Sequence, residues 1–249
     1  MDLLWRALRR RDAALRLVDA LIAPGQVIAD VGASVGLFTC RMARLVGPAG
    51  RVHAFEPNPQ RHARLRALAG RRRPITLHPV ALSDTAGEAE LWIPRVEGRV
   101  FAERAFLDRP GDHASAEPVA VPLATFDAEV GEDGEHVAFI KCDVEGHERA
   151  VLAGAANTLD RARPAVLVEV EERHHTRPLD EILADVVPGD YVAWAVTEHG
   201  LRPADEIDIE RDHREPLREA GNATPGPDYH NDFLLLPLGR RPPSELTVR

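Results

Sequence analysis

Apolar and polar residues follow two different repeats along this chain, one typical of helices and one of buried strands. Over residues 3–22, Leu, Val and Ile recur at near-helical spacing with arginines between them, which predicts an amphipathic helix. Pro24 and Gly25 should end this helix. Residues 1–25 are therefore expected to form an N-terminal helical segment that precedes the main domain.

From residue 26 onward, short continuous apolar runs alternate with helical patterns. The predicted strands are residues 26–32, 51–57, 75–84, 136–146, 165–172, 191–200 and 232–238, and the predicted helices are residues 37–47, 60–70, 147–162 and 179–187. Strands that are apolar without interruption are typical of a mostly parallel sheet covered by helices on both faces. We therefore predict a doubly wound, Rossmann-like α/β domain over residues 26–238.

Two polar stretches interrupt this alternation. Residues 93–122 and 211–231 are rich in Arg, Glu, Pro and Gly, so both are predicted to be loops. Long loops in compact domains are usually functional lids or disordered segments, and a lid insertion over residues 93–122 is one interpretation. Residues 239–249 are predicted to be a flexible tail.

Composition limits the class of protein. A chain of 249 residues with 44% hydrophobic content can build one sizeable α/β domain. Its formal net charge of -9 and pI near 5.7 argue against nucleic acid as a partner, because phosphate backbones attract a positive surface. Cys40 and Cys142 form no metal-binding pattern, and the charged N-terminus predicts neither a signal peptide nor a membrane span. We expect a cytoplasmic protein without a membrane partner.

Candidate chemistry begins at the end of the first predicted strand. There Asp30 precedes a turn that contains Gly32 and Gly36, where the backbone can turn tightly and approach a ligand. The next strand ends in Glu56, twenty residues after Gly36, and a carboxylate at that place can accept hydrogen bonds from a ribose diol. These residues predict a site for a nucleoside cofactor.

The glycine turn fits more than one class of cofactor site. A nicotinamide site normally needs G-x-G-x-x-G, whereas this turn reads G-x-S-x-G, and Asp30 would lie close to the pyrophosphate. S-adenosylmethionine carries no phosphate, and its ammonium group would be stabilised by an acid. The residues therefore favour S-adenosylmethionine.

The same turn also matches the nucleophile elbow of serine hydrolases, with Ser34 as nucleophile. Such enzymes build several strands and an oxyanion-hole loop before the elbow, but only about thirty residues precede Ser34. A hydrolase also gives Glu56 no role. This alternative is therefore disfavoured.

At this point the sequence resembles the FkbM-type methyltransferases over roughly residues 26–237. The matching segments are residues 30–36 (DVGASVG), 55–59 (FEPNP), 80–84 (VALSD), 141–146 (KCDVEG) and 231–234 (NDFL). The resemblance implies a seven-stranded, mostly parallel sheet with an antiparallel last strand. It also implies S-adenosylmethionine as methyl donor and a small acceptor that is O-methylated, such as a natural product or a sugar.

The resemblance further implies a role for each matching residue. The methionine part of the cofactor would be bordered by Asp30, Gly32, Ser34 and Gly36; the ribose would be held by Glu56 with Asn58 nearby; the adenine would be flanked by Ser83 and Asp84. Two positions depart from the family pattern. Ser34 stands where asparagine is common, and His147 stands where phenylalanine is common.

The fourth predicted strand carries polar residues on one side. Lys141, Asp143 and Glu145 share that side because side chains alternate along a strand. A buried ammonium is costly without a partner, so Lys141 should pair with a carboxylate, and Glu169 on the following strand is the candidate.

Methyl transfer to a hydroxyl also requires removal of a proton. The candidate bases near the strand ends are Asp143, His147 and His174. The carboxylates Asp143, Glu145, Glu169 and Glu171 could also bind Mg²⁺, but we favour a mechanism without metal. A protein that binds S-adenosylmethionine without turnover is the alternative from another class. The sequence leaves open the identity of the small-molecule acceptor and whether the chain forms a homo-oligomer.

Overall fold

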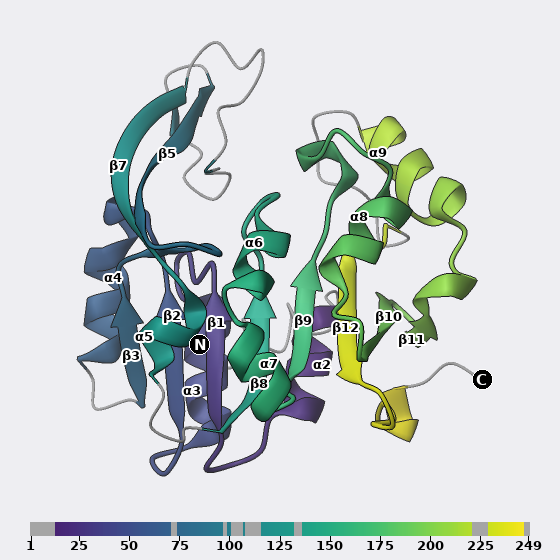
Figure 1. Ribbon diagram of the computed structural model, residues 1–249, viewed down its shortest axis with the longest axis horizontal. Coiled ribbons are helices and arrows are strands. Elements are labelled where there is room, and N and C mark those ends of the chain that lie inside the picture. The colour runs from purple at the N-terminus through teal and green to yellow at the C-terminus, as the bar shows by residue number, and fades with distance from the viewer. Residues whose placement is uncertain are drawn as a thin grey trace. The chain divides into compact units, whose positions relative to one another are not determined.

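The computed structural model describes residues 13–70, 74–96, 99–100, 107, 116–131, 136–220 and 229–246. The chain forms two compact units (Figure 1). We call residues 23–164 the central unit, and residues 1–22 together with 165–249 the terminal unit.

The central unit contains a parallel ladder of four strands. These are β1 (Val27–Val31), β2 (Arg51–Phe55), β3 (Ile75–His78) and β8 (Val137–Cys142), in the order β3-β2-β1-β8. The chain builds outward from β1 to β3 and then returns to the other side of β1. The strand order therefore reverses between β1 and β8, and in open α/β sheets ligands bind at the carboxyl ends of the strands at such a point.

Helices connect these strands as the sequence predicted. α3 (Leu37–Val46) joins β1 to β2 and packs on both, and α4 (Pro59–Ala69) packs on β3. The single helix expected over residues 147–162 is two helices, α6 (Glu148–Ala153) and α7 (Ala156–Arg161), because Gly154, a poor helix former, lies between them.

A second sheet in the central unit corrects the loop prediction for residues 93–122. β5 (Gly87–Val96) pairs antiparallel with β7 (Ala116–Ala124), and the short strands β4 (Ala81–Leu82) and β6 (Arg99–Val100) pair with β7 and β5. The loop prediction was wrong at both ends of this stretch. These strands bury only one face, which carries Leu91, Ile93 and Val121, so their apolar residues form no continuous run in the sequence. The middle of the predicted lid, residues 101–106 and 108–115, lies outside the described residues.

The terminal unit contains the remaining strands, in the order β9-β12-β10-β11. Here β12 (Asp232–Pro237) runs antiparallel to both β9 (Ala165–Glu169) and β10 (Tyr191–Thr197). The antiparallel last strand is therefore confirmed, as is the Rossmann-like α/β class. β11 (Gly200–Pro203) was not predicted; it forms a hairpin with β10.

The helices of the terminal unit include part of the predicted N-terminal helix. α2 (Ala13–Leu21) packs on β10, and residues 1–12 lie outside the described residues. α8 (Leu179–Val186) joins β9 to β10. The predicted loop over residues 211–231 is corrected at its start, where a π-helical turn, η4 (Glu210–Arg214), leads into α9 (Glu215–Ala220). The described chain ends in a 3-10 turn, η5 (Ser244–Leu246), and no helix in the described part is long and apolar enough to cross a membrane.

Candidate functional site

The predicted cofactor residues gather where the strand order of the central unit reverses. Asp30 on β1 lies opposite Lys141 on β8, and one residue later Val31 lies opposite Cys142. The Asp143 N–H donates to the Val31 carbonyl at 3.1 Å, so the two strand ends stay together beyond the ladder. The structure therefore brings Asp30, the glycine turn and Asp143 into one site.

Asp30 is fully buried, and only one of its carboxylate oxygens is satisfied. Thr39 on α3 donates its hydroxyl to Oδ2 at 2.5 Å, while Oδ1 has no partner among the described residues. Burial raises the pKa of this carboxyl, although the Lys141 ammonium and the Thr39 hydroxyl oppose the rise. A buried carboxylate oxygen without a donor is a place where a donor from a ligand, such as an ammonium group, fits.

The glycines of the turn are required by contacts within the protein. Gly32 has φ +79°, and a Cβ there would lie 1.8 Å from the Asp143 carbonyl oxygen. Gly36 has φ +80°, and a Cβ there would lie 2.6 Å from Leu68 on α4. Only glycine allows the turn to pass this close to β8 and α4.

Glu56 ties the end of β2 to the glycine turn. Its Oε2 accepts from the Ser34 N–H at 2.7 Å and its Oε1 from the Asn58 N–H at 2.8 Å. The side chain is 6% exposed, and burial raises its pKa against these two donors. Because each carboxylate oxygen can accept more than one hydrogen bond, both oxygens keep a lone pair for a ribose diol.

Asn58 and Ser34 support this arrangement from the loops. The Asn58 side chain caps α4 by accepting from the Gln60 N–H at 3.0 Å. Ser34 has φ +48° and is half-buried. Among the described residues its hydrogen bond is the one that its backbone gives to Glu56, so the hydroxyl lacks the histidine partner that a hydrolase nucleophile needs.

Ser83, Asp84 and His147 form a second group in the central unit. The Ser83 hydroxyl donates to Asp84 Oδ1 at 3.2 Å, and His147 Nε2 lies 3.0 Å from the same hydroxyl oxygen. Ser83 is buried and Asp84 is exposed. His147, predicted as a candidate base, is thus in contact with the residue that the family resemblance assigns to adenine.

Lys141 is buried, as predicted, and is held by a carboxylate. Its ammonium donates to Asp143 Oδ2 at 2.9 Å and lies 4.7 Å from the centre of the Phe38 ring. Glu169, the partner proposed from sequence, belongs to the terminal unit and accepts from the Asn231 amide at 2.6 Å. Asp143 is 31% exposed, so its carboxylate is open to a ligand.

The third candidate base, His174, lies in the terminal unit. Its Nε2 is 3.2 Å from Glu171 Oε2, and Arg173 pairs with the same carboxylate. Burial would raise the pKa of Glu171, but His174 and Arg173 outweigh it and lower the pKa. Within the described ranges, no group of three or more His, Cys, Asp or Glu side chains is placed to hold a metal ion.

Two residues that hold the site were not predicted from sequence. Thr39 bonds Asp30, and the His62 ring donates to the Glu56 carbonyl at 2.7 Å. Both lie on the helices that directly follow the two acids, on the faces turned toward the strand ends. The spacing of Thr39 and His62 in the helices that follow the two acids was the signal available in the sequence. That spacing does not distinguish a buried polar residue from one exposed to solvent.

Comparison with known proteins identifies the family of the chain. Residues 30–189 match the model of the methyltransferase FkbM domain. The 2-O-methyltransferase NoeI of Sinorhizobium fredii is 29% identical over 158 residues, which cover 59% of this chain and 65% of the relative. The 31-O-demethyl-FK506 methyltransferase FkbM of Streptomyces tacrolimicus is 32% identical over 190 residues, covering 66% of this chain and 70% of the relative.

A solved structure supports the fold. The crystal structure of methyltransferase FkbM from Methylobacillus flagellatus matches with a TM-score of 0.50 at 15% identity, over 90% of this chain and 50% of that one. This chain thus spans half the length of that protein and less than two thirds of NoeI. The family model covers most of the chain, from Asp30 at the site to α8. The chain therefore belongs to the FkbM methyltransferase family.

Proposed function

We propose that this protein transfers a methyl group from S-adenosylmethionine to a hydroxyl oxygen of a small-molecule acceptor. The observation that carries the proposal is the buried Asp30 carboxylate, whose Oδ1 has no donor among the described residues. Burying such an oxygen costs free energy unless a ligand completes it. An ammonium group, as in the methionine part of the cofactor, is a matching donor.

Other residues of the central unit would hold the rest of the cofactor. Glu56 is fixed by two backbone donors and keeps a lone pair on each oxygen for the ribose. Ser83 and Asp84, with His147 against them, would border the adenine. When bound, S-adenosylmethionine supplies an electrophilic methyl group.

Asp143 is the proposed base. Lys141 fixes its Oδ2, and the carboxylate is open to an acceptor beside the glycine turn. In that position Oδ1 would accept the proton of the acceptor hydroxyl, and this proton removal needs no metal. His147 and His174 are secondary candidates. Oxygen as the acceptor atom is supported by the relatives, which are named for 2-O- and 31-O-methylation.

Replacing Glu56 tests the cofactor site directly. Glu56→Ala removes the ribose acceptor, so affinity for S-adenosylhomocysteine should fall by about 1.5–3 kcal/mol, which is roughly 10- to 100-fold. Isothermal titration calorimetry on the purified chain measures this loss. Glu88→Ala is the control, because Glu88 is an exposed carboxylate of the same unit.

Two results would contradict the proposal. Equal affinity in wild type and Glu56→Ala would remove Glu56 from the site. Tight binding without release of adenosylhomocysteine for any acceptor in a panel of sugars and hydroxylated metabolites would instead favour a binding protein without catalysis.

A further inference from the structure

Ser83, the residue directly after β4, is held in place through each of its polar groups. Its N–H donates to the Ala124 carbonyl at 2.9 Å, and its hydroxyl contacts Asp84 and His147. Its carbonyl lies so close to Gly154 that a Cβ added there would come within 2.0 Å of the carbonyl oxygen. Ser83 is 4% exposed, whereas Asp84 is exposed. A fixed, buried serine is therefore bonded to an exposed carboxylate.

The contacts of the Ser83 hydroxyl define which nitrogen of His147 carries a proton. A hydroxyl has one proton and a carboxylate can only accept, so the contact of 3.2 Å with Asp84 Oδ1 uses that proton. His147 Nε2 lies 3.0 Å from the same hydroxyl oxygen, so it must carry a proton and donate. Because Nε2–H occupies a lone pair of the hydroxyl oxygen, the hydroxyl proton stays directed at Asp84.

Gly154 holds the same serine from the other end of α6. Its φ of -71° lies in the right-handed helical region that any residue adopts, so glycine is required by contact and not by backbone conformation. The Gly154 carbonyl accepts at 3.1 Å from the Asp127 N–H on α5 (Phe126–Val130). The Asp127 carboxylate accepts from two N–H groups of α7 at 2.9 and 3.0 Å. The junction of α6 and α7 is thus anchored, and a side chain at position 154 would displace Ser83.

These contacts lie on the side of the parallel ladder where ligands bind. His147 follows Asp143 in the segment that leaves the carboxyl end of β8, and its ring contacts Ser83. Glu56, which would hold the ribose under the proposed function, follows the carboxyl end of β2 in the same ladder. Ser83 and Asp84 are therefore held on the edge of the sheet that carries the rest of the cofactor site.

A carboxylate in a fixed position selects a ligand that donates. Asp84 Oδ1 accepts from Ser83, and both carboxylate oxygens can only accept. The exocyclic amino group of adenine donates, whereas the carbonyl group that replaces it in hypoxanthine only accepts. A site built to pair with a donor rejects an analogue that lacks this donor, because its own polar group is left unpaired.

We propose that His147 and Gly154 are positioning residues that set the preference for the base of the cofactor. From the two ends of α6 they fix Ser83, and through Ser83 they orient the Asp84 carboxylate toward the amino group of adenine. This inference rests on the proposed function, because Ser83 and Asp84 border the base only if the cofactor binds at this site.

Calorimetry of the full chain with S-adenosylhomocysteine and with S-inosylhomocysteine measures the preference for the amino group. Wild type should bind the adenosyl compound about tenfold more tightly. His147→Phe keeps an aromatic ring but removes Nε2–H, so it should reduce this preference about threefold. His147→Gln should retain the preference, because its amide can donate to the Ser83 hydroxyl. Gly154→Ala should reduce the preference about threefold by displacing Ser83.

The ratio of the two affinities separates positioning from a general structural defect, which would weaken both ligands equally. Gly87→Ala is the matched control for Gly154→Ala, because nothing lies within 4 Å of a Cβ added at Gly87. This control should keep the preference of wild type. If Gly154→Ala does not fold, the two His147 variants decide.

Several results would overturn the inference. An unchanged preference in His147→Phe would do so, and so would a preference lost equally in His147→Gln and His147→Phe. A wild type that binds both compounds equally would overturn the inference and leave the cofactor site standing. A wild type that binds neither compound would contradict the proposed function and the inference with it.

Discussion

At the scale of single residues, Ser34 is held in a backbone conformation that favours another residue. Ser34 stands at φ +48°, in the left-handed region that asparagine tolerates better than other residues with a side chain. The resemblance to the family implies asparagine at this position. The contact that Ser34 makes here is the backbone N–H that donates to Glu56, which any residue except proline supplies.

Ser34→Asn should therefore stabilise the protein. A residue held in the left-handed region costs on the order of 1–3 kcal/mol, and asparagine should recover about 0.5 kcal/mol of this. Urea denaturation should show a higher midpoint at an unchanged slope. A lower midpoint would mean that the serine hydroxyl has a structural role.

His213 is a second residue whose neighbours decide its protonation state. The ring is fully buried; Nδ1 donates to the His230 carbonyl at 2.8 Å, and Nε2 accepts from the Glu172 N–H at 3.2 Å. The Nε2 contact requires the neutral ring, because a protonated Nε2 cannot accept a hydrogen bond. Burial lowers the pKa of His213 below 6.5, although the His230 carbonyl and Glu172 oppose this.

Acid should destabilise the protein through His213. Since the folded pKa is depressed, the unfolded chain binds more protons below pH 6.5. The free energy of unfolding should then fall with decreasing pH by at most about 1.4 kcal/mol per unit. Comparing urea unfolding at pH 7.5 and 5.5 should give a smaller drop in His213→Gln than in wild type. Equal drops would assign the acid sensitivity to other groups.

At the scale of elements, the site depends on how closely the turn after β1 approaches β8. The Gly32 backbone lies against the Asp143 carbonyl, and the Asp143 N–H bonds Val31. A side chain at Gly32 would separate the two strand ends and displace Asp30 and Asp143 together.

Gly32→Ala should cost at least about 3 kcal/mol of stability, because overpacking adds to the strain of φ +79°. Gly47→Ala is the matched control: Gly47 has φ +65° but nothing within 4 Å of an added Cβ, so only about 1 kcal/mol of strain is expected. Chemical denaturation of both variants measures the difference. Equal losses would show that the turn can move away from β8.

The elements also show where sequence reasoning succeeded. Strands such as β1 and β8 are apolar on both faces, so their pattern identified them and their ends identified Asp30, Glu56 and Asp143. The strand β7 has one exposed face and two prolines, and it gains its partner β5 from about thirty residues away. Such pairings, like the contact between His147 and Ser83, depend on distance in space and are not encoded in local spacing.

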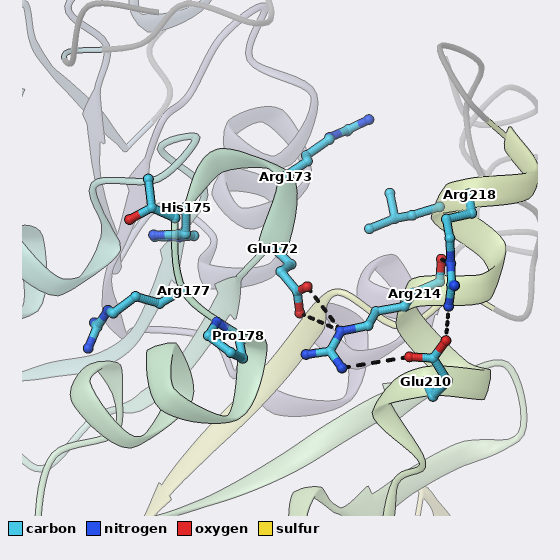
Figure 2. Close-up of a pocket in the computed structure, with 10 residues that line it drawn as sticks. Glu172, Arg173, His175, Arg177, Pro178, Glu210, Arg214 and Arg218 are labelled. Atoms are coloured by element: carbon cyan, nitrogen blue, oxygen red, sulfur yellow. Dashed lines mark hydrogen bonds and ion pairs between the residues drawn. The ribbon is translucent and has the colours of Figure 1, made fainter. Parts of the chain in front are cut away.

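At the scale of the whole molecule, charge is distributed unevenly. The formal net charge of -9 excluded nucleic acid as a first hypothesis, but the total does not reveal a pocket of the terminal unit that is lined by four arginines (Figure 2). Two of those arginines, Arg214 and Arg218, lie on the π-helical turn η4 and helix α9, which form where a loop was predicted.

The packing of α2 on β10 has a consequence for synthesis on the ribosome. Leu15, Leu17 and Val18 on α2 are at most 2% exposed in the folded protein, and the strand on which α2 packs begins at Tyr191. At typical elongation rates, α2 waits on the order of 10–30 s before its partner is translated. During that interval the apolar face of α2 lacks its partner strand, so aggregation during expression should respond to translation speed.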